Sequence, residues 1–275
     1  MWLAKRRRLA YREGVDTLPF ALLALDLDGT LLNEAGEAPP GLLAELRAWE
    51  AAGAHLAILT ARAWVPTLLS DWPVNTVSRC YGAQLRQGGQ VIRERALAPQ
   101  TVAAALGLLD ARDLAAGGKT VVVTRDPAHA VRPTNMAALR RGAAAPGVLK
   151  VVQGGDPKRL DDLQVAWAAL PGAAVIRERP GRVVLVAPGA DKGRALAGLR
   201  RRLGVPRRRV LAAGDGPADA TMLGHAGLFV RVGACAALAH AGQTVAGPAE
   251  LCRLLEARRL NPGSPRPPAA PAQMR

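Results

Sequence analysis

The sequence has 275 residues, which is enough for one large domain or for two modest domains that each bury a core. Its formal net charge of +15 favours anionic partners, but only 3% of the residues are aromatic and no zinc-finger or helix-turn-helix signature is present, which argues against a specific nucleic-acid partner. Three widely spaced cysteines exclude a disulfide framework, and no apolar run reaches the roughly 18 residues that span a bilayer, so we expect a cytoplasmic protein without a membrane partner.

The chain begins with a basic segment. We expect residues 1–16 to form an extension rather than an export signal, because the apolar run that follows ends in two acids and not in a small-residue cleavage site. That run, residues 20–25, is continuously apolar, which is typical of a strand buried on both faces of a parallel sheet. A helix is predicted from Pro39 to Ala52, and a second strand over residues 55–59. This order predicts a parallel sheet with active groups at the carboxyl ends of its strands.

The later chain changes to short strand-like runs separated by helical stretches before the first pattern returns. The predicted fold class is therefore α/β: a Rossmann-like, doubly wound parallel sheet as the core domain, over residues 17–79 and 188–260, with an inserted α+β cap domain over residues 80–187. Residues 261–275 are rich in proline and alanine and contain almost no large apolar side chain, so we expect a disordered tail.

The first chemical motif, Asp26-Leu-Asp-Gly-Thr30, directly follows the first predicted strand. Side chains two apart along an extended chain share a face, so we expect Asp26 and Asp28 to point into one pocket. Two neighbouring carboxylates repel each other and are best tolerated beside a divalent cation, and hard oxygen ligands suit Mg²⁺. One carboxylate can then attack phosphorus while the other donates a proton to the leaving group.

Two single residues add to this motif. Thr60 ends the second predicted strand, where its hydroxyl can donate a hydrogen bond to a phosphoryl oxygen, although a threonine at a strand end is more often a cap or turn residue. Lys192 opens a predicted helix, where its ammonium can act as a point charge on a phosphoryl oxygen or on a nucleophilic carboxylate. A solvated lysine in the first turn is the plainer interpretation of that residue taken alone.

A second acidic pair, Asp215 and Asp219, follows a strand predicted over residues 210–213. Together with Asp26 and Asp28, this pair predicts an acidic site at the edge of one sheet, in a chain that is otherwise strongly basic. Acids gathered against the background composition favour a metal site over a simple turn.

These elements, in this order and at these strand ends, resemble the haloacid dehalogenase superfamily of phosphatases and phosphotransferases, over about residues 20–259. The resemblance implies that Asp26 is the nucleophile and Asp28 the general acid and base, in a phosphatase or phosphomutase rather than a dehalogenase. It implies that Thr60 binds the phosphoryl group and that Lys192 stabilises its charge. The implied Mg²⁺ ligands are the carboxylates of Asp26, Asp215 and Asp219 and the backbone carbonyl of Asp28.

The insert lies between the threonine and lysine motifs, as in the Cof-like sugar phosphatases. The resemblance therefore implies a magnesium-dependent phosphatase whose partner is a small phosphorylated metabolite, such as a sugar phosphate. Two positions depart from the family pattern: Ala61 replaces the usual glycine, which is a mild change, and Ala218 replaces the usual asparagine. If that asparagine orients the lysine or the metal aspartates, its absence leaves these groups less well held, so we expect low but real turnover. The alternatives are a sugar phosphomutase that needs a bisphosphate activator, a binding or regulatory homologue without turnover, and, on charge alone, a nucleic-acid binder.

Overall fold

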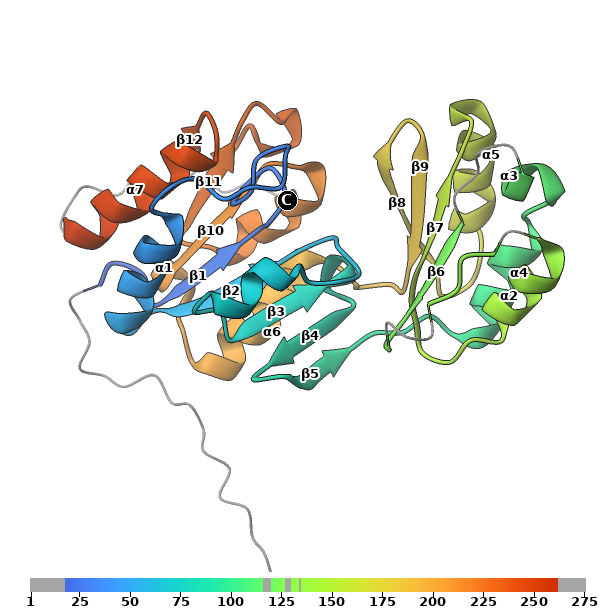
Figure 1. Cartoon of the computed structure of the whole chain (residues 1–275), viewed down its shortest axis with the longest axis horizontal. Helices are drawn as coiled ribbons and strands as arrows, with labels where there is room; N and C mark the ends of the chain where they lie inside the picture. Colours follow the sequence, from blue (N-terminus) through green and yellow to red (C-terminus); the bar gives the residue numbers. More distant parts are fainter. Residues whose placement is uncertain (1–17, 116–119, 127–129, 134, 262–275) are drawn as a thin grey trace, which may run out of the picture.

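The computed structural model describes residues 18–115, 120–126, 130–133 and 135–261. The predicted basic extension lies outside these residues, as does the predicted tail except for Asn261. Figure 1 shows two lobes, a larger one around an eight-stranded sheet and a smaller one around a four-stranded sheet. Within the described residues, no helix has both the length and the apolar character that crossing a bilayer requires.

The large sheet brings the two ends of the described chain together. Its strand order is β12-β11-β10-β1-β2-β3-β4-β5, and all neighbours from β12 to β3 are parallel. The strands are β1 (Leu22–Leu25), β2 (His55–Leu59), β3 (Thr76–Arg79), β4 (Gln84–Gln87), β5 (Gln90–Glu94), β10 (Val210–Gly214), β11 (Leu228–Val232) and β12 (Gln243–Val245). Short 3₁₀ helices in this lobe are η1 (Thr67–Asp71), η2 (Cys80–Gly82), η4 (Arg207–Arg209) and η6 (Ala236–Leu238).

Helices cover both faces of the large sheet. On one face lie α1 (Leu42–Ala51) and α7 (Pro248–Leu260), in the same apolar cluster as Leu23 and Leu25 of β1. On the other face lie α6 (Lys192–Leu203) and the 3₁₀ helix η5 (Pro217–His225), in the cluster that contains Leu22 and Ala24. Because side chains alternate along a strand, a strand covered on both faces must be apolar at every position. The predicted doubly wound core is confirmed.

The inserted domain begins later than predicted. We placed its start at residue 80, but β4 pairs antiparallel with β3, and β5 pairs antiparallel with β4, so both strands extend the large sheet. The chain reverses at η2, where Cys80 and Tyr81 have positive φ angles of 51° and 61°. The hairpin that follows buries Leu85 in the cluster beneath α6. Burial of this side chain holds residues 84–94 to the core, and the insert starts after them.

The small lobe is an antiparallel sheet with helices on one face. Its strand order is β6-β7-β9-β8. Its elements are α2 (Pro99–Gly107), α3 (Ala111–Ala115), β6 (Val121–Thr124), α4 (Met136–Ala143), β7 (Val148–Gly154), α5 (Pro157–Ala168), β8 (Ala174–Arg179) and β9 (Arg182–Val186). One face packs on α2, α4 and α5, while Leu149, Val184 and Val186 on the other face share a cluster with Tyr81 of the large lobe. The predicted α+β insert is therefore a cap, and the face of its sheet that carries no helices packs against the core.

Candidate active site

Asp26 is the first residue after β1, at the carboxyl end of the parallel sheet. Its backbone N–H donates to the carbonyl of Ala213 in β10 over 3.0 Å, so the strand pairing positions the residue itself. Its side chain lies deep in the protein, and the residue is only 5% exposed. A carboxylate buried to this extent requires neighbouring positive charge.

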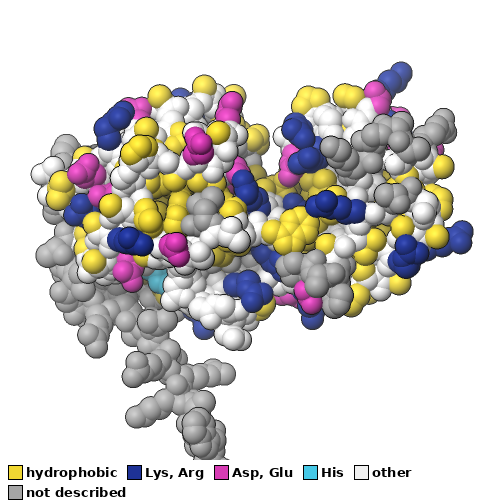
Figure 2. Space-filling model, viewed as in Figure 1, with side chains coloured by type: hydrophobic (Ala, Val, Ile, Leu, Met, Phe, Trp, Pro, Cys, Tyr) yellow, Lys and Arg dark blue, Asp and Glu magenta, His cyan; other side chains and the backbone are white. Residues whose placement is uncertain are grey.

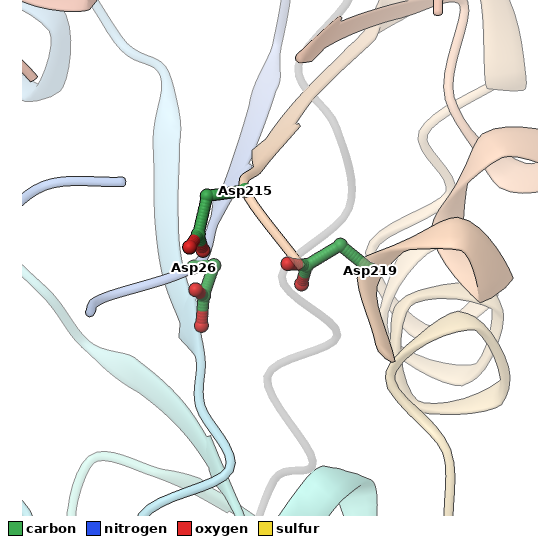
Figure 3. A group of neighbouring side chains, drawn as sticks. All are labelled: Asp26, Asp215 and Asp219. Carbon is green, nitrogen blue, oxygen red and sulfur yellow. The ribbon is translucent and has the colours of Figure 1, made fainter. Parts of the chain in front are cut away.

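Two further carboxylates reach Asp26 from the segment after β10 (Figure 3). Asp26, Asp215 and Asp219 each present a carboxylate oxygen, and these oxygens all lie within 4.8 Å of one another. Two glycines make this approach possible. A Cβ atom on Gly29 would lie 2.2 Å from Asp215 Oδ2, and one on Gly214 would lie 2.3 Å from Asp219 Cγ. Any side chain at either glycine would displace a carboxylate from the cluster.

Lys192 is the cation within this cluster. Its Nζ donates to Asp26 Oδ1 over 2.5 Å and to Asp219 Oδ1 over 2.7 Å. The residue begins α6 and is 2% exposed. The helix approaches η5 closely because Gly193 has no side chain: a Cβ atom there would lie 2.0 Å from the carbonyl oxygen of Thr221. Lys192 is therefore a buried part of the site, and not the solvated lysine that its sequence position alone favoured.

Burial dominates the titration of the carboxylates. It raises the pKa of Asp26 to about 6 and that of Asp219 to about 6, although Lys192 acts in the opposite direction on both. It also raises the pKa of Asp215. Burial acts to lower the pKa of Lys192, but Asp26 and Asp219 outweigh it and the net shift is upward.

The donor set fits a magnesium ion. One ammonium group faces three carboxylates, so the described cluster of Asp26, Asp215 and Asp219 carries excess negative charge that a divalent cation neutralises. All of the donors are oxygen atoms, which Mg²⁺ prefers over softer metals. The residues present therefore suit the metal that the sequence predicted.

Asp28 stands apart from the three-carboxylate cluster. Its Oδ1 and Oδ2 accept hydrogen bonds from Arg62 Nη2 and Nε, over 2.6 and 2.7 Å. Both side chains are partly open to solvent, at 49% for Asp28 and 39% for Arg62. The carboxylate lines the same cleft as Asp26, which agrees with a shared pocket. Its role in proton transfer and the metal contact of its carbonyl remain predictions.

Two partners of the carboxylates were missed from the sequence. Arg62 was not assigned to the site from the sequence, yet it forms the two-pronged ion pair with Asp28. Its place two residues after the strand-end Thr60 was the available signal. Thr30, the last residue of the first motif, is fully buried and its hydroxyl donates to Asp215 Oδ1 over 3.2 Å.

Thr60 lies immediately after β2 and is almost fully buried. Its Oγ1 accepts the backbone N–H of Arg62 over 3.0 Å, so the side chain shapes the turn that carries Arg62. The next residue, Ala61, lines the cleft. The hydroxyl proton of Thr60 is left to donate elsewhere, and its predicted contact with a phosphoryl oxygen remains a prediction.

The acidic cluster opens into a cleft of about 520 Å³ between the lobes. The core contributes the carboxylates and Lys192, and the cap contributes Ile176, Arg177, Glu178, Arg179 and Arg182. Figure 2 shows the hollow between the two lobes with charged side chains on both walls. A substrate that reaches the carboxylates with one end therefore contacts the β8–β9 hairpin with the other end.

A family model described as haloacid dehalogenase-like hydrolase matches residues 23–136 and 141–241 of this chain. The match covers all six residues that the sequence singled out: Asp26, Asp28, Thr60, Lys192, Asp215 and Asp219. No curated protein matches the chain significantly.

Solved structures share the two-lobed fold. A haloacid dehalogenase-like hydrolase from B. subtilis has a TM-score of 0.73 at 18% identity, covering 86% of this chain and 99% of its own. A sugar phosphatase of subclass IIB has a TM-score of 0.72 at 20% identity, and the match covers 87% of this chain and 98% of that one. A phosphatase of the superfamily from Bacteroides thetaiotaomicron has a TM-score of 0.70 at 20% identity, and the match covers 90% of this chain and 97% of that one. At these identities, the likeness establishes the fold.

Proposed function

The chain belongs to the haloacid dehalogenase-like hydrolases, and we propose that it is a magnesium-dependent phosphatase that hydrolyses a small phosphorylated metabolite through an aspartyl-phosphate intermediate. The observation that carries this proposal is the carboxylate of Asp26, buried at a strand end, with Lys192 Nζ 2.5 Å from one of its oxygens and two more carboxylates beside it. A sugar phosphate is the preferred substrate class, because a sugar phosphatase shares both the core and the cap.

In the first half of the reaction, an oxygen of Asp26 attacks the phosphorus atom of the monoester, and the bond from phosphorus to the leaving oxygen breaks. Asp28 gives its proton to that oxygen, so the leaving group departs as an alcohol. For this step, one oxygen of Asp28 turns from Arg62 toward the leaving group, which its solvent exposure permits. The products are an aspartyl phosphate and the free alcohol.

In the second half, a water molecule attacks the phosphorus atom of the aspartyl phosphate while Asp28 removes its proton. The bond between phosphorus and Asp26 breaks, which restores the carboxylate and releases inorganic phosphate. Lys192 holds Asp26 in place and offsets its charge in both halves, and the Thr60 hydroxyl donates to a phosphoryl oxygen. Asp26, Asp215 and Asp219 would hold a Mg²⁺ ion, which would supply the positive charge that lets a phosphate dianion approach carboxylates.

The test is a hydrolysis screen over phosphorylated metabolites and an activated aryl phosphate, each with Mg²⁺ and with a chelator. We expect phosphate release in Mg²⁺ that stops in the chelator and returns when Mg²⁺ is added back. Equal rates with and without the chelator would contradict the metal site. A rate that appears only with a sugar bisphosphate present would identify a phosphomutase instead.

A further inference from the structure

The cap wall of the cleft contains an irregularity in its β-pairing. Along β8 and β9, Arg177 pairs with Val183 and Arg179 pairs with Arg182, so Glu178 is an extra residue without a partner across the ladder. Such a bulge changes the direction of the side chains around it, and bulges are common beside active sites. This one lies in the only strand pair of the described cap residues that lines the cleft.

The register determines which way the charged side chains point. Val184 and Val186 lie in the apolar cluster that includes Tyr81 of the core, so that face of β9 is turned toward the core. Arg182 is two residues before Val184 and shares its face. Arg179 lies directly opposite Arg182, and residues opposite each other in an antiparallel pair share a face. Both arginines line the cleft together with Asp26.

Most charges of the cleft have a partner within the protein. Lys192 contacts Asp26 and Asp219, and Arg62 contacts Asp28. On the cap, Glu178 accepts the hydroxyl of Tyr81 and forms an ion pair with Arg182 over 3.3 Å.

Arg177 also lines the cleft, but its guanidinium is bound elsewhere. Its Nη2 lies 2.8 Å from Asp161 Oδ1 and donates to the carbonyls of Pro157 and Pro180. Arg179 is exposed and contacts no acidic side chain among the described residues. The wall formed by Glu178, Arg179 and Arg182 therefore presents two guanidinium groups against one carboxylate.

We propose that Arg179, with Arg182 beside it, binds a second anionic group on the leaving group of the substrate, a carboxylate or a second phosphate. The inference rests on the proposed phosphatase function and narrows its substrate class to phosphomonoesters that carry another anion, such as sugar-acid phosphates or sugar bisphosphates. A planar guanidinium donates two parallel hydrogen bonds to either group, and Asp26 lines the same cleft as Arg179 and Arg182. A neutral sugar leaves the positive charge of Arg179 without a counter-charge.

The experiment compares matched substrate pairs in Mg²⁺: glucose 6-phosphate with 6-phosphogluconate, and fructose 6-phosphate with fructose 1,6-bisphosphate. We expect kcat/KM to be at least about tenfold higher for the doubly anionic member of one pair or both, since a charge-assisted contact contributes roughly that factor. The first pair reports on a carboxylate and the second on a phosphate. Equal kcat/KM within both pairs overturns the proposal.

Arg179→Gln should reduce this preference to about threefold or less, mainly through KM, because the contact is made in the bound substrate. Arg140→Gln is the control: Arg140 is exposed on α4, on the helical side of the cap, and should keep the wild-type preference. A preference that Arg179→Gln leaves intact also overturns the proposal. If no phosphomonoester is hydrolysed, including an aryl phosphate, the proposed phosphatase function itself has failed, whereas hydrolysis without preference rejects the second anion alone.

Discussion

Asp26 combines two properties that a nucleophilic carboxylate needs: a fixed position and a neighbouring cation. The strand pairing holds its backbone, and Lys192 holds one oxygen at 2.5 Å. The third acid of the cluster, Asp215, is bound by Thr30. The carboxylates are thus pre-positioned by the protein, which removes the need to order them when substrate binds.

Asp26→Asn tests the intermediate at the residue scale. An amide of the same shape keeps the packing but cannot attack phosphorus, so we expect the hydrolysis of an aryl phosphate in Mg²⁺ to fall by on the order of 10⁴-fold or more. Circular dichroism should show an unchanged fold. Activity within about tenfold of wild type would show that the phosphoryl group does not pass through Asp26.

Ala218 is the departure from the family pattern that the structure clarifies. From the sequence, we expected the missing asparagine to leave the metal carboxylates poorly held. The loop has other supports: Asp219 Oδ2 accepts the N–H of Gly216 over 3.0 Å, and the Thr221 hydroxyl donates to the carbonyl of Ala218 over 2.9 Å. The same hydroxyl accepts the N–H of Gly193, which ties the loop to α6.

Ala218→Asn should therefore change kcat by less than about threefold, equivalent to roughly 0.6 kcal/mol, and leave KM nearly constant. Steady-state kinetics with one good substrate in saturating Mg²⁺ measure both constants. A rise in kcat of tenfold or more would show that the loop supports seen in the structure do not replace the asparagine.

At the scale of elements, the contact between α6 and η5 places Lys192. The contact exists because Gly193 leaves room for the backbone of Thr221. The same helix carries a second glycine, Gly198, where an added Cβ atom would point into open space. The two glycines differ in surroundings but share a helix. They form a matched pair for substitution.

Gly193→Ala should force α6 away from η5 and move Lys192 from Asp219. We expect a loss of about 1 to 3 kcal/mol in the free energy of unfolding, and a clear loss of kcat. Gly198→Ala should instead stabilise the protein by up to about 1 kcal/mol and retain kcat, because alanine favours a helix and meets no obstacle. Urea unfolding and steady-state kinetics compare the two variants; similar effects from both would refute this account of the contact.

At the scale of the whole molecule, Arg79 joins the two lobes. It is 4% exposed at the end of β3, and its guanidinium donates to Gln84 Oε1 over 2.7 Å and to the Ala63 carbonyl over 2.8 Å. It also donates to the carbonyl of Arg125, just after β6 of the cap. One buried side chain of the core therefore binds both its own sheet and the cap.

Arg79→Met should lower the free energy of unfolding by about 2 to 4 kcal/mol, because it leaves buried carbonyls without donors. Arg140→Met, an exposed substitution on α4, should change it by less than about 0.5 kcal/mol. Urea denaturation followed by circular dichroism gives both values. A loss below about 1 kcal/mol for Arg79→Met would mean that this link between the lobes is dispensable.

The sequence by itself determined the core and the chemistry placed on it. The apolar run at residues 20–25 predicts a strand buried on both faces of a parallel sheet. The acids directly after it lie at the carboxyl end of that strand, where such sheets place their active groups. Asp26, Asp215 and Asp219 were identified because they follow predicted strands of one sheet, and the structure gathers their carboxylates. The mutual repulsion of such acids already indicated a cation.

Only the tertiary structure decided contacts between segments that are distant in the chain. The hairpin of β4 and β5 has short strands that suit either sheet, and their pairing with β3 assigned them to the core. The pairing of Arg62 with Asp28 spans 34 residues, and the bulge at Glu178 depends on the register between β8 and β9. Local patterns specify which residues form a strand and which face they share, whereas the partner strand and the partner charge depend on packing energies summed over the whole fold.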